Sequence, residues 1–223
     1  MQRIKATGEE IQVKIPAGQV FLGGQLSVPP KAQGIVIFAH GSGSSRFSPR
    51  NILVADELRE AGLGTLLFDL LTPEEEEIDE RTMELRFNIG LLTSRLVAVT
   101  DWIKQQKTTQ KLKIGYFGAS TGAAAALAAA AERPNMVEAV VSRGGRPDMA
   151  GAALPKVKAP TLLIVGGNDF QVIELNRQAS MYLRSIKELK IVPHATHLFE
   201  EPGTLEEVSQ LASHWFSKYM VST

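Results

Sequence analysis

Short apolar runs alternate with longer segments of helical periodicity along most of this chain. After an expected antiparallel hairpin, buried strands are predicted at 34–40, 64–71, 112–118, 137–145, 159–167 and 188–193. The hairpin would be formed by 11–16 and 19–29, and helices are predicted at 48–62, 78–106, 120–134, 171–185 and 204–220. Such alternation is typical of a parallel sheet with helices on both faces. We therefore expect an α/β fold, a three-layer α/β/α sandwich with a mostly parallel central sheet.

The domain organisation follows from length and spacing. A chain of 223 residues suits one medium-sized domain, and no internal repeat or Gly- and Pro-rich linker divides it. We therefore interpret residues 1–223 as a single domain. The connection between the strands at 137–145 and 159–167 is too short to hold a lid domain, so we expect an open site.

Composition excludes several classes of protein. The 24 Lys and Arg residues balance the 24 Asp and Glu residues, so the chain has no basic footprint for nucleic acid or a membrane surface. Without cysteine it can form no disulfide, thiolate nucleophile or cysteine-ligated metal site. Residues 1–16 lack the apolar run of a secretory signal. We expect a cytoplasmic monomer or homodimer with no metal and no organic cofactor.

The segment GASTG, residues 118–122, stands where an apolar strand gives way to a helix. A nucleophile on such a sharp turn is held in a strained backbone conformation, and its neighbours must lack bulk for the turn to close. The helix that follows directs N–H groups toward the reaction. We therefore predict that Ser120 is a nucleophile, with an ordinary tight turn as the alternative.

The Gly-rich segment HGSGSS begins at His40, where the strand that starts at Gly34 ends. A phosphate-binding P-loop would need a following Gly-Lys-Ser/Thr, and a dinucleotide site would need G-x-G-x-x-G; neither is present. We interpret the segment as a loop whose N–H groups stabilise an oxyanion. His40 is expected to order this loop rather than to act as a base.

Candidate acids and bases follow two later strands. Asp169 comes after the strand at 159–167, while His194 and His197 come after the strand at 188–193. Serine needs a base to take its proton, and the imidazole needs a carboxylate that fixes its tautomer. The chain order Ser, Asp, His is the order of an α/β-hydrolase triad. Asp169 is the preferred acid, and Asp148 is the reserve.

Together these residues resemble the α/β-hydrolase superfamily and, within it, the dienelactone hydrolase-like family. GASTG resembles the nucleophile elbow, HGSGSS the oxyanion loop, GGND the acid turn and HATHLFEEPG the histidine loop. The resemblance implies an α/β-hydrolase fold with a Ser120–His197–Asp169 triad. It also implies an oxyanion hole formed by the backbone N–H groups of Ser42 and Thr121.

The chain also departs from that family. Dienelactone hydrolases use a cysteine nucleophile, whereas Ser120 stands here. The segments DLLTPEEE and SRGGRPD resemble small hydrolases that occur alone or fused to phosphoribosyltransferases. The resemblance therefore supports the catalytic machinery more strongly than any particular substrate.

Two charged groupings lie near the expected site. Arg143 and Arg146 flank a Gly-Gly turn and could bind a substrate carboxylate, or else form surface ion pairs. The acidic run from Glu74 to Glu77 is interpreted as a solvated face or a first helical turn, with an anion-repelling rim as the alternative.

The expected function is that of a serine hydrolase which cleaves small or short-acyl carboxylic esters through an acyl-enzyme, with a small-molecule ester as its only partner. A lactonase, thioesterase or peptidase would use the same triad. A non-catalytic ligand-binding protein of the same fold is the alternative from another class.

Overall fold

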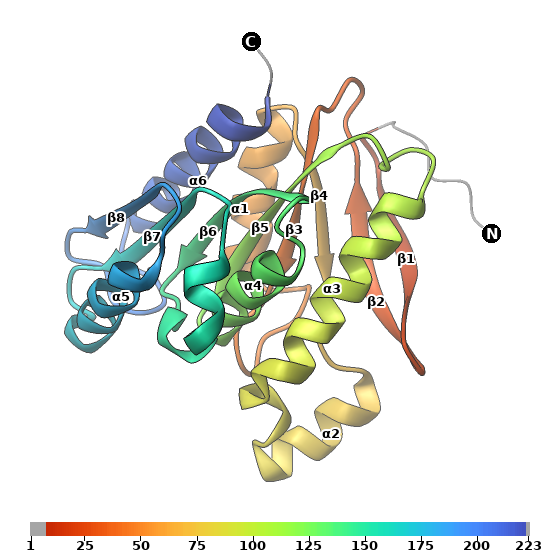
Figure 1. Ribbon diagram of the computed structural model, residues 1–223. Helices are drawn as coiled ribbons and strands as arrows, with labels where there is room; N and C mark the ends of the chain where they lie inside the picture. The colour runs from red at the N-terminus through yellow and green to blue at the C-terminus, as the bar shows by residue number, and fades with distance from the viewer. Residues whose placement is uncertain (1–7, 222–223) are drawn as a thin grey trace.

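The computed structural model describes residues 8–221, which form an eight-stranded sheet with helices on both faces (Figure 1). The strand order across the sheet is β1-β2-β4-β3-β5-β6-β7-β8. The strands are β1 (Glu10–Ala17), β2 (Val20–Ser27), β3 (Gly34–Ala39), β4 (Gly64–Phe68), β5 (Lys113–Ala119), β6 (Val137–Arg143), β7 (Thr161–Gly166) and β8 (Lys187–Val192). The predicted α/β sandwich is confirmed.

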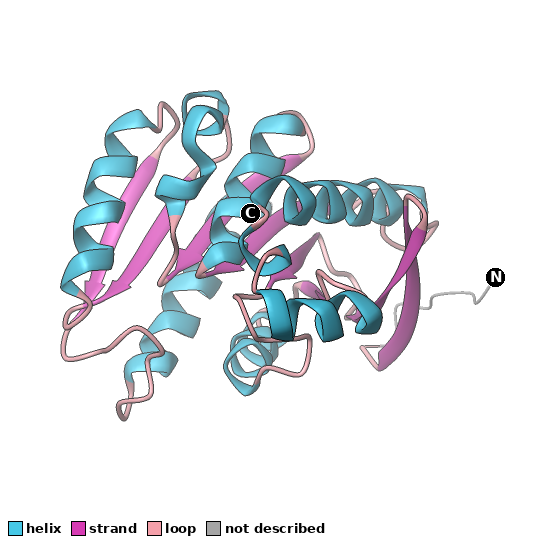
Figure 2. Ribbon diagram, turned by 90° about the horizontal axis from the view of Figure 1, so that it is seen from below, coloured by secondary structure: helices cyan, strands magenta, loops and turns pink. Residues whose placement is uncertain are grey.

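Strand direction changes only at one side of the sheet. β1 pairs antiparallel with β2, and β2 pairs antiparallel with β4. All pairings from β4 through β8 are parallel. The carboxyl ends of these parallel strands therefore meet at one edge, seen from below in Figure 2, where ligands bind in sheets of this type.

Three hydrophobic clusters, two of them large, hold the helices against the sheet. The helical elements are α1 (Pro49–Glu60), α2 (Pro73–Thr82), η1 (Leu85–Phe87), α3 (Ile89–Gln105), α4 (Thr121–Glu132), η2 (Pro147–Lys156), α5 (Phe170–Tyr182) and α6 (Thr204–Met220). α1 and α6 cover one face, and α3, α4, η2 and α5 cover the other (Figure 1). Every residue of β3 and of β4 is buried, as expected for strands covered on both faces.

The predicted helix at 78–106 is wrong in its boundaries. Helix α2 begins at Pro73, after Thr72 and Glu75 form a capping box. It ends before Met83, which has a left-handed φ of 56°. Asn88 then starts α3 by accepting a hydrogen bond from the N–H of Leu91 at 3.0 Å. The break therefore comes from the end of α2 at Met83 and the Asn88 cap of α3.

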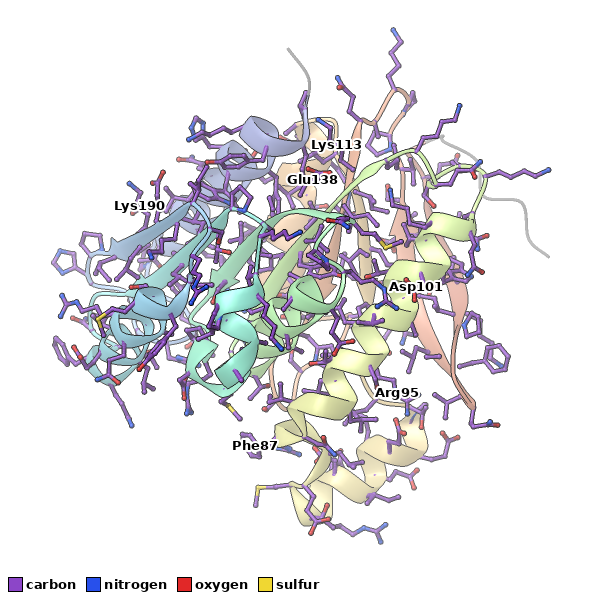
Figure 3. All side chains as sticks on the ribbon, in the orientation of Figure 1. Phe87, Arg95, Asp101, Lys113, Glu138 and Lys190 are labelled. Atoms are coloured by element: carbon purple, nitrogen blue, oxygen red, sulfur yellow. The ribbon has the colours of Figure 1, made fainter. Side chains whose placement is uncertain are left out.

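Helix α2 and η1 lie below the carboxyl edge of the sheet (Figure 1). Arg95 of α3, labelled in Figure 3, donates from Nη2 to the Glu75 carboxylate of α2 at 2.6 Å. Its Nη1 donates to the Ala17 carbonyl at 3.0 Å. Glu74, Glu75 and Glu76 occupy the first turn of α2. This is the first helical turn that the sequence analysis gave as one interpretation of the acidic run.

The connection between β6 and β7 holds η2 and no inserted lid domain. Its residues pack on α4 and α5 through Ala150 and Leu154. None of the helices within residues 8–221 combines the length and the apolar character needed to cross a membrane.

Candidate active site

Ser120 stands between β5 and α4 in a strained backbone conformation. Its φ of 49° and ψ of −122° lie outside the regions that a residue with a side chain normally occupies. Such strain costs about 1–3 kcal/mol and persists only where the surroundings impose it. The turn lifts Ser120 out of the sheet, with its side chain at the start of a helix.

The two flanking glycines are required by close packing. A Cβ added at Gly118 would lie 2.4 Å from the Cα of Ala123. A Cβ added at Gly122 would lie 2.2 Å from the Ala39 carbonyl oxygen. Both distances are far below van der Waals contact, so only glycine allows α4 to approach β3 and β5 this closely.

The loop after β3 lies against the start of α4. The Ser42 hydroxyl and the Thr121 hydroxyl are 2.9 Å apart and share a hydrogen bond. Within residues 8–221, neither backbone N–H donates a hydrogen bond to another residue. Gly41 approaches Ser120 so closely that a Cβ there would lie 3.0 Å from the serine Cβ. Two unused N–H groups therefore flank the nucleophile.

His40 fastens this loop to the neighbouring strand end. Its Nε2 accepts a hydrogen bond from the N–H of Leu70 at 3.0 Å, and its Nδ1 lies 2.9 Å from the Gly41 carbonyl oxygen. Burial lowers the pKa of His40, partly opposed by the Gly41 hydrogen bond and the Asp69 charge. A neutral, fully engaged imidazole orders the loop and has no nitrogen left to act as a base.

His197 and Asp169 form the other half of the site. Nδ1 of His197 lies 2.6 Å from Oδ2 of Asp169. With Nδ1–H donating to the carboxylate, Nε2 is left as a proton acceptor. The Asp169 side chain is 14% exposed and the His197 side chain is 40% exposed, so the base can reach a substrate while its carboxylate partner is shielded.

The acid turn and the histidine loop are joined by backbone contacts. The N–H of Asn168 donates to the Ala195 carbonyl at 2.9 Å, and its side-chain amide donates to the His194 carbonyl at 2.9 Å. A Cβ at Gly166 would lie 2.4 Å from the Ala195 carbonyl oxygen. Phe199 is 1% exposed and anchors the loop in the core. These contacts fix His197 relative to Asp169.

Ser120 and His197 line the same pocket, which has about 150 Å³ of free space. The remaining lining residues are Gly41, Ser42, Ser44, Arg50, Ala119, Arg143 and Leu198. Thr121 instead lines an adjacent pocket that shares Gly41 and Ser42 with the first. A substrate carbonyl in the pocket would thus meet a serine, an imidazole and the loop after β3.

The structure separates the preferred residues from the alternatives. His194 is exposed and takes no part in lining the pocket. Asp148, the reserve acid, accepts two hydrogen bonds from the Arg146 guanidinium, at 2.9 and 2.7 Å. Its carboxylate is therefore engaged by an arginine, whereas Asp169 faces a histidine.

The two arginines near the Gly-Gly turn also differ. Arg143 is 6% exposed and lines the pocket with Ser120. The side chain of Arg146 points to Asp148, does not line the pocket, and has its pKa raised by that hydrogen-bonded pair. Only Arg143 stands where a substrate could contact it.

Sequence reasoning missed Arg50 and Asn51, which lie in the first turn of α1. Arg50 lines the pocket, and the Asn51 side-chain oxygen lies 3.5 Å from Nη2 of Arg143. The segment SPRN follows the Gly-rich loop and begins a predicted helix. This position at the carboxyl edge of the sheet was the signal that could have identified Arg50 and Asn51 as site residues.

The segment from Asp79 to Arg86 supports the loop after β3 that contains Ser42. Arg86 donates from Nε to the Asp79 carboxylate at 2.6 Å, and Asp79 also accepts the backbone N–H groups of Leu85 and Arg86. Burial raises the pKa of Asp79, but these hydrogen bonds outweigh it and hold that pKa below its ordinary value. The carbonyl of Arg86 in turn faces the Ser42 hydroxyl at 3.5 Å.

Metal ligation has no candidate in the part of the chain that the structure describes. No group of three or more His, Asp or Glu side chains is arranged there to hold an ion. The chemistry available at the pocket is that of a hydroxyl, an imidazole, a carboxylate and two guanidinium groups.

A family model matches most of the chain. Residues 20–219 match the model of the dienelactone hydrolase family. This chain belongs to that family. The match covers all seven strands from β2 to β8 and every element that carries a site residue.

Solved structures of family members and of other hydrolases share its architecture. The dienelactone hydrolase of Anabaena variabilis is 63% identical, with a TM-score of 0.94 over 95% of this chain and 98% of that one. XC6422 from Xanthomonas campestris, an α/β serine hydrolase without lid, is 20% identical with a TM-score of 0.77, over 100% of both chains. The latter likeness shows the fold alone, an α/β hydrolase without a lid.

A curated relative is much longer than this chain. A Mycobacterium tuberculosis protein that carries the name of a phosphoribosyl transferase is 57% identical over 209 residues. The match covers 94% of this chain but 46% of the relative. The name therefore belongs to a protein of about twice the length and does not decide the activity of the matched part.

Proposed function

We propose that this member of the dienelactone hydrolase family is a serine hydrolase that cleaves small or short-acyl carboxylic esters. The observation that carries the proposal is that a strained Ser120 and His197 line one pocket, while Nδ1 of His197 lies 2.6 Å from the Asp169 carboxylate. A serine held at φ 49° is difficult to explain by packing alone, because strain of this kind clusters at active sites.

The proposed first step is acylation. Ser120 Oγ attacks the ester carbonyl carbon while Nε2 of His197 takes its proton. Asp169 stabilises the imidazolium through Nδ1–H. The N–H groups of Ser42 and Thr121 donate to the oxyanion, a contribution of about 3 kcal/mol for each such donor. His197 then protonates the leaving alcohol, and the acyl group stays on Ser120.

Deacylation repeats the same chemistry with water. His197 takes a proton from water, the hydroxide attacks the acyl carbonyl, and Ser120 leaves with the proton from His197. The free volume of about 150 Å³ favours short acyl groups over lipid chains. The proposed steps use groups of the chain, the substrate and one water molecule.

Labelling with a neutral fluorophosphonate tests the proposal directly. The expected result is a single adduct on Ser120 in the intact mass, mapped by peptide analysis, and its loss in His197→Ala. A folded wild-type protein that gives no adduct would refute the activated serine and favour a non-catalytic binding protein.

A lactone is the second candidate substrate, since it is a cyclic ester. The name of the 63%-identical Anabaena variabilis protein favours it. A panel of p-nitrophenyl esters, thioesters, lactones and aminoacyl amides separates these activities by kcat/KM, because the triad itself serves all of them.

A further inference from the structure

Strand β8 forms one edge of the sheet and is open along its outer side. It is the last strand in the order across the sheet, next to β7 (Figure 1). The other edge strand, β1, contains Pro16, which has no N–H and protects an edge from pairing, whereas β8 has no proline and pairs with β7 without a bulge. We propose that two copies of this chain pair antiparallel through β8, about a two-fold axis at Leu189. This inference does not depend on the proposed hydrolase activity.

The backbone of β8 determines which of its residues are free to pair. The N–H of Thr161 donates to the Ile186 carbonyl just before β8, at 2.8 Å. The N–H of Gly167 donates to the Val192 carbonyl at the end of β8, also at 2.8 Å. Successive residues of a strand direct their backbone groups alternately to its two sides, so the even-numbered residues bond β7. The residues whose backbone groups point to the free edge are therefore Lys187, Leu189 and Ile191.

A two-fold axis at Leu189 brings these free groups together. Leu189 then forms a hydrogen-bonded pair with its own copy, and Lys187 forms one with Ile191 of the second copy. Each such pair can exchange two N–H to carbonyl hydrogen bonds. An axis between two residues would instead oppose free groups to groups that already bond β7. The axis must therefore pass through a residue.

Charge selects Leu189 from the residues at the centre of β8. An axis at Glu188 would place that carboxylate opposite its own copy, and an axis at Lys190 would do the same with an ammonium group. An axis at Leu189 places each Glu188 opposite Lys190 of the second copy. These are non-hydrogen-bonded pairs, whose Cα atoms lie about 4.5 Å apart and whose side chains are close. Opposite charges in such a position stabilise a sheet, and like charges destabilise it.

The side chains of Glu188 and Lys190 are available for this contact. Within one chain Nζ of Lys190, which is labelled in Figure 3, lies 3.4 Å from the Glu188 carboxylate. The two side chains are 40% and 48% exposed, so each can also reach a second copy. Pairing would then give an alternating row of charges across the axis on one face of the joined sheet.

The lysines of β8 do not block its edge. Unmatched lysines on an edge strand discourage association. Lys190 has Glu188 as its partner, and Nζ of Lys187 donates to the Leu183 carbonyl of its own chain at 2.6 Å. Ile191 is 38% exposed at this edge, so pairing would also remove apolar surface from water.

Antiparallel pairing keeps the two pockets apart. The carboxyl end of β8 leads into the loop that carries His197. With the axis at Leu189, Val192 of one copy lies opposite Ile186 of the second. The two histidine loops therefore lie at opposite edges of the joined sheet. Labelling of Ser120 by a fluorophosphonate should be the same in monomer and dimer.

Single charge reversals test the contact by analytical ultracentrifugation in low-salt buffer. The wild type should sediment at twice the chain mass of 24.2 kDa. Glu188→Lys opposes two ammonium groups, and Lys190→Glu opposes two carboxylates. Because the axis repeats each contact, either change should raise the Kd of the dimer at least about tenfold. Glu60→Lys, an equal charge change at the exposed end of α1, is the matched control and should keep the wild-type Kd.

Mixing the two single variants is the deciding experiment. In a mixed dimer the two ammonium groups of Glu188→Lys face the two carboxylates of Lys190→Glu, so every cross-strand contact is attractive again. We expect the mixture to dimerise with nearly the wild-type Kd although each variant alone does not. The double variant Glu188→Lys/Lys190→Glu exchanges both charges within one chain and should also regain the wild-type Kd.

Three results would overturn the proposal. One is a wild-type protein that stays monomeric at concentrations up to about 1 mM. Another is a dimer whose Kd is the same in Glu188→Lys and Lys190→Glu as in the wild type, which would place the interface elsewhere. The third is a loss of dimer in the single variants that neither mixing nor the double exchange restores, since the register at Leu189 requires both to succeed.

Discussion

The backbone N–H of Ser120 donates a hydrogen bond to the carbonyl oxygen of Arg143, with 3.3 Å between nitrogen and oxygen. The Ser120 carbonyl accepts a hydrogen bond from the N–H of Arg146 at 3.1 Å. The end of β6 and the turn that follows it therefore hold the nucleophile through both its backbone N–H and its backbone carbonyl. The same strand end supplies the buried guanidinium group of the pocket, so nucleophile and charge are positioned by one element.

Replacement of Ser120 separates activity from strain. Ser120→Ala should lower kcat by about 10⁴- to 10⁶-fold, as in other triads. Ser120→Gly should be equally inactive but more stable than Ser120→Ala by about 1 kcal/mol, because glycine adopts the left-handed φ without a steric penalty. Urea unfolding and p-nitrophenyl ester assays measure the two effects. Wild-type turnover in Ser120→Ala would rule out the proposed nucleophile.

The close packing around Gly122, next to the Ser120 turn, leads to a second prediction. Gly122→Ala should destabilise the protein by about 1–3 kcal/mol or more, because the new Cβ would meet the Ala39 carbonyl oxygen at 2.2 Å. Gly90→Ala is the matched control, since its nearest neighbour would be 3.5 Å away. There the free energy of unfolding should stay constant or rise by up to about 1 kcal/mol. Equal effects at the two positions would contradict the packing argument.

Much of the fold could be predicted because its signals are local. Apolar runs bounded by turn residues gave all eight strands, and right-handed βα alternation then restricts the topology. The prediction of one helix over 78–106 was wrong because periodicity alone does not show where a helix ends. A left-handed Met83 and the Asn88 cap divide it, and Asp79 turns the chain by accepting two later N–H groups.

The site could be predicted only where its residues follow strands in a known order. Ser120, Asp169 and His197 each come directly after a strand or in the loop that follows it, so topology alone brings them to one edge. Arg50 and Arg143 line the same pocket only because of the way α1 packs on the sheet. Periodicity in the sequence does not show which distant residues such packing brings together. Arg146 seemed equivalent to Arg143 because its contact with Asp148 depends on side-chain direction.

The identity of the acid makes a third prediction. Asp169→Asn should lower kcat about 10⁴-fold, because an amide stabilises the wrong tautomer of His197 while preserving the shape of the site. Asp148→Asn is the matched control, since its carboxylate binds Arg146 outside the pocket. We expect its kcat to stay within a few-fold of wild type. A larger loss in Asp148→Asn than in Asp169→Asn would reverse the assignment of the acid.

The buried His40 makes the stability of the protein depend on pH. Burial lowers its pKa, against the opposing Gly41 hydrogen bond and Asp69 charge, so the folded state binds a proton less readily than the unfolded state. Below the unfolded pKa of about 6.5 the unfolded chain takes up a proton at this position that the folded chain does not. Stability from this group is therefore complete above about pH 6.5 and decreases as the pH falls, with a slope approaching 1.4 kcal/mol per pH unit, roughly the maximum for one proton.

His40→Gln isolates this contribution. A glutamine side-chain oxygen can still accept the Leu70 N–H that His40 Nε2 accepts at 3.0 Å, but it does not titrate. Urea unfolding of both proteins between about pH 5 and pH 8 should show the wild type losing stability relative to the variant below about pH 6.5. Above that pH the two curves should run parallel. Parallel curves over the whole range would mean that His40 binds a proton as readily in the folded as in the unfolded protein, and that its role in holding the loop beside Ser120 needs another explanation.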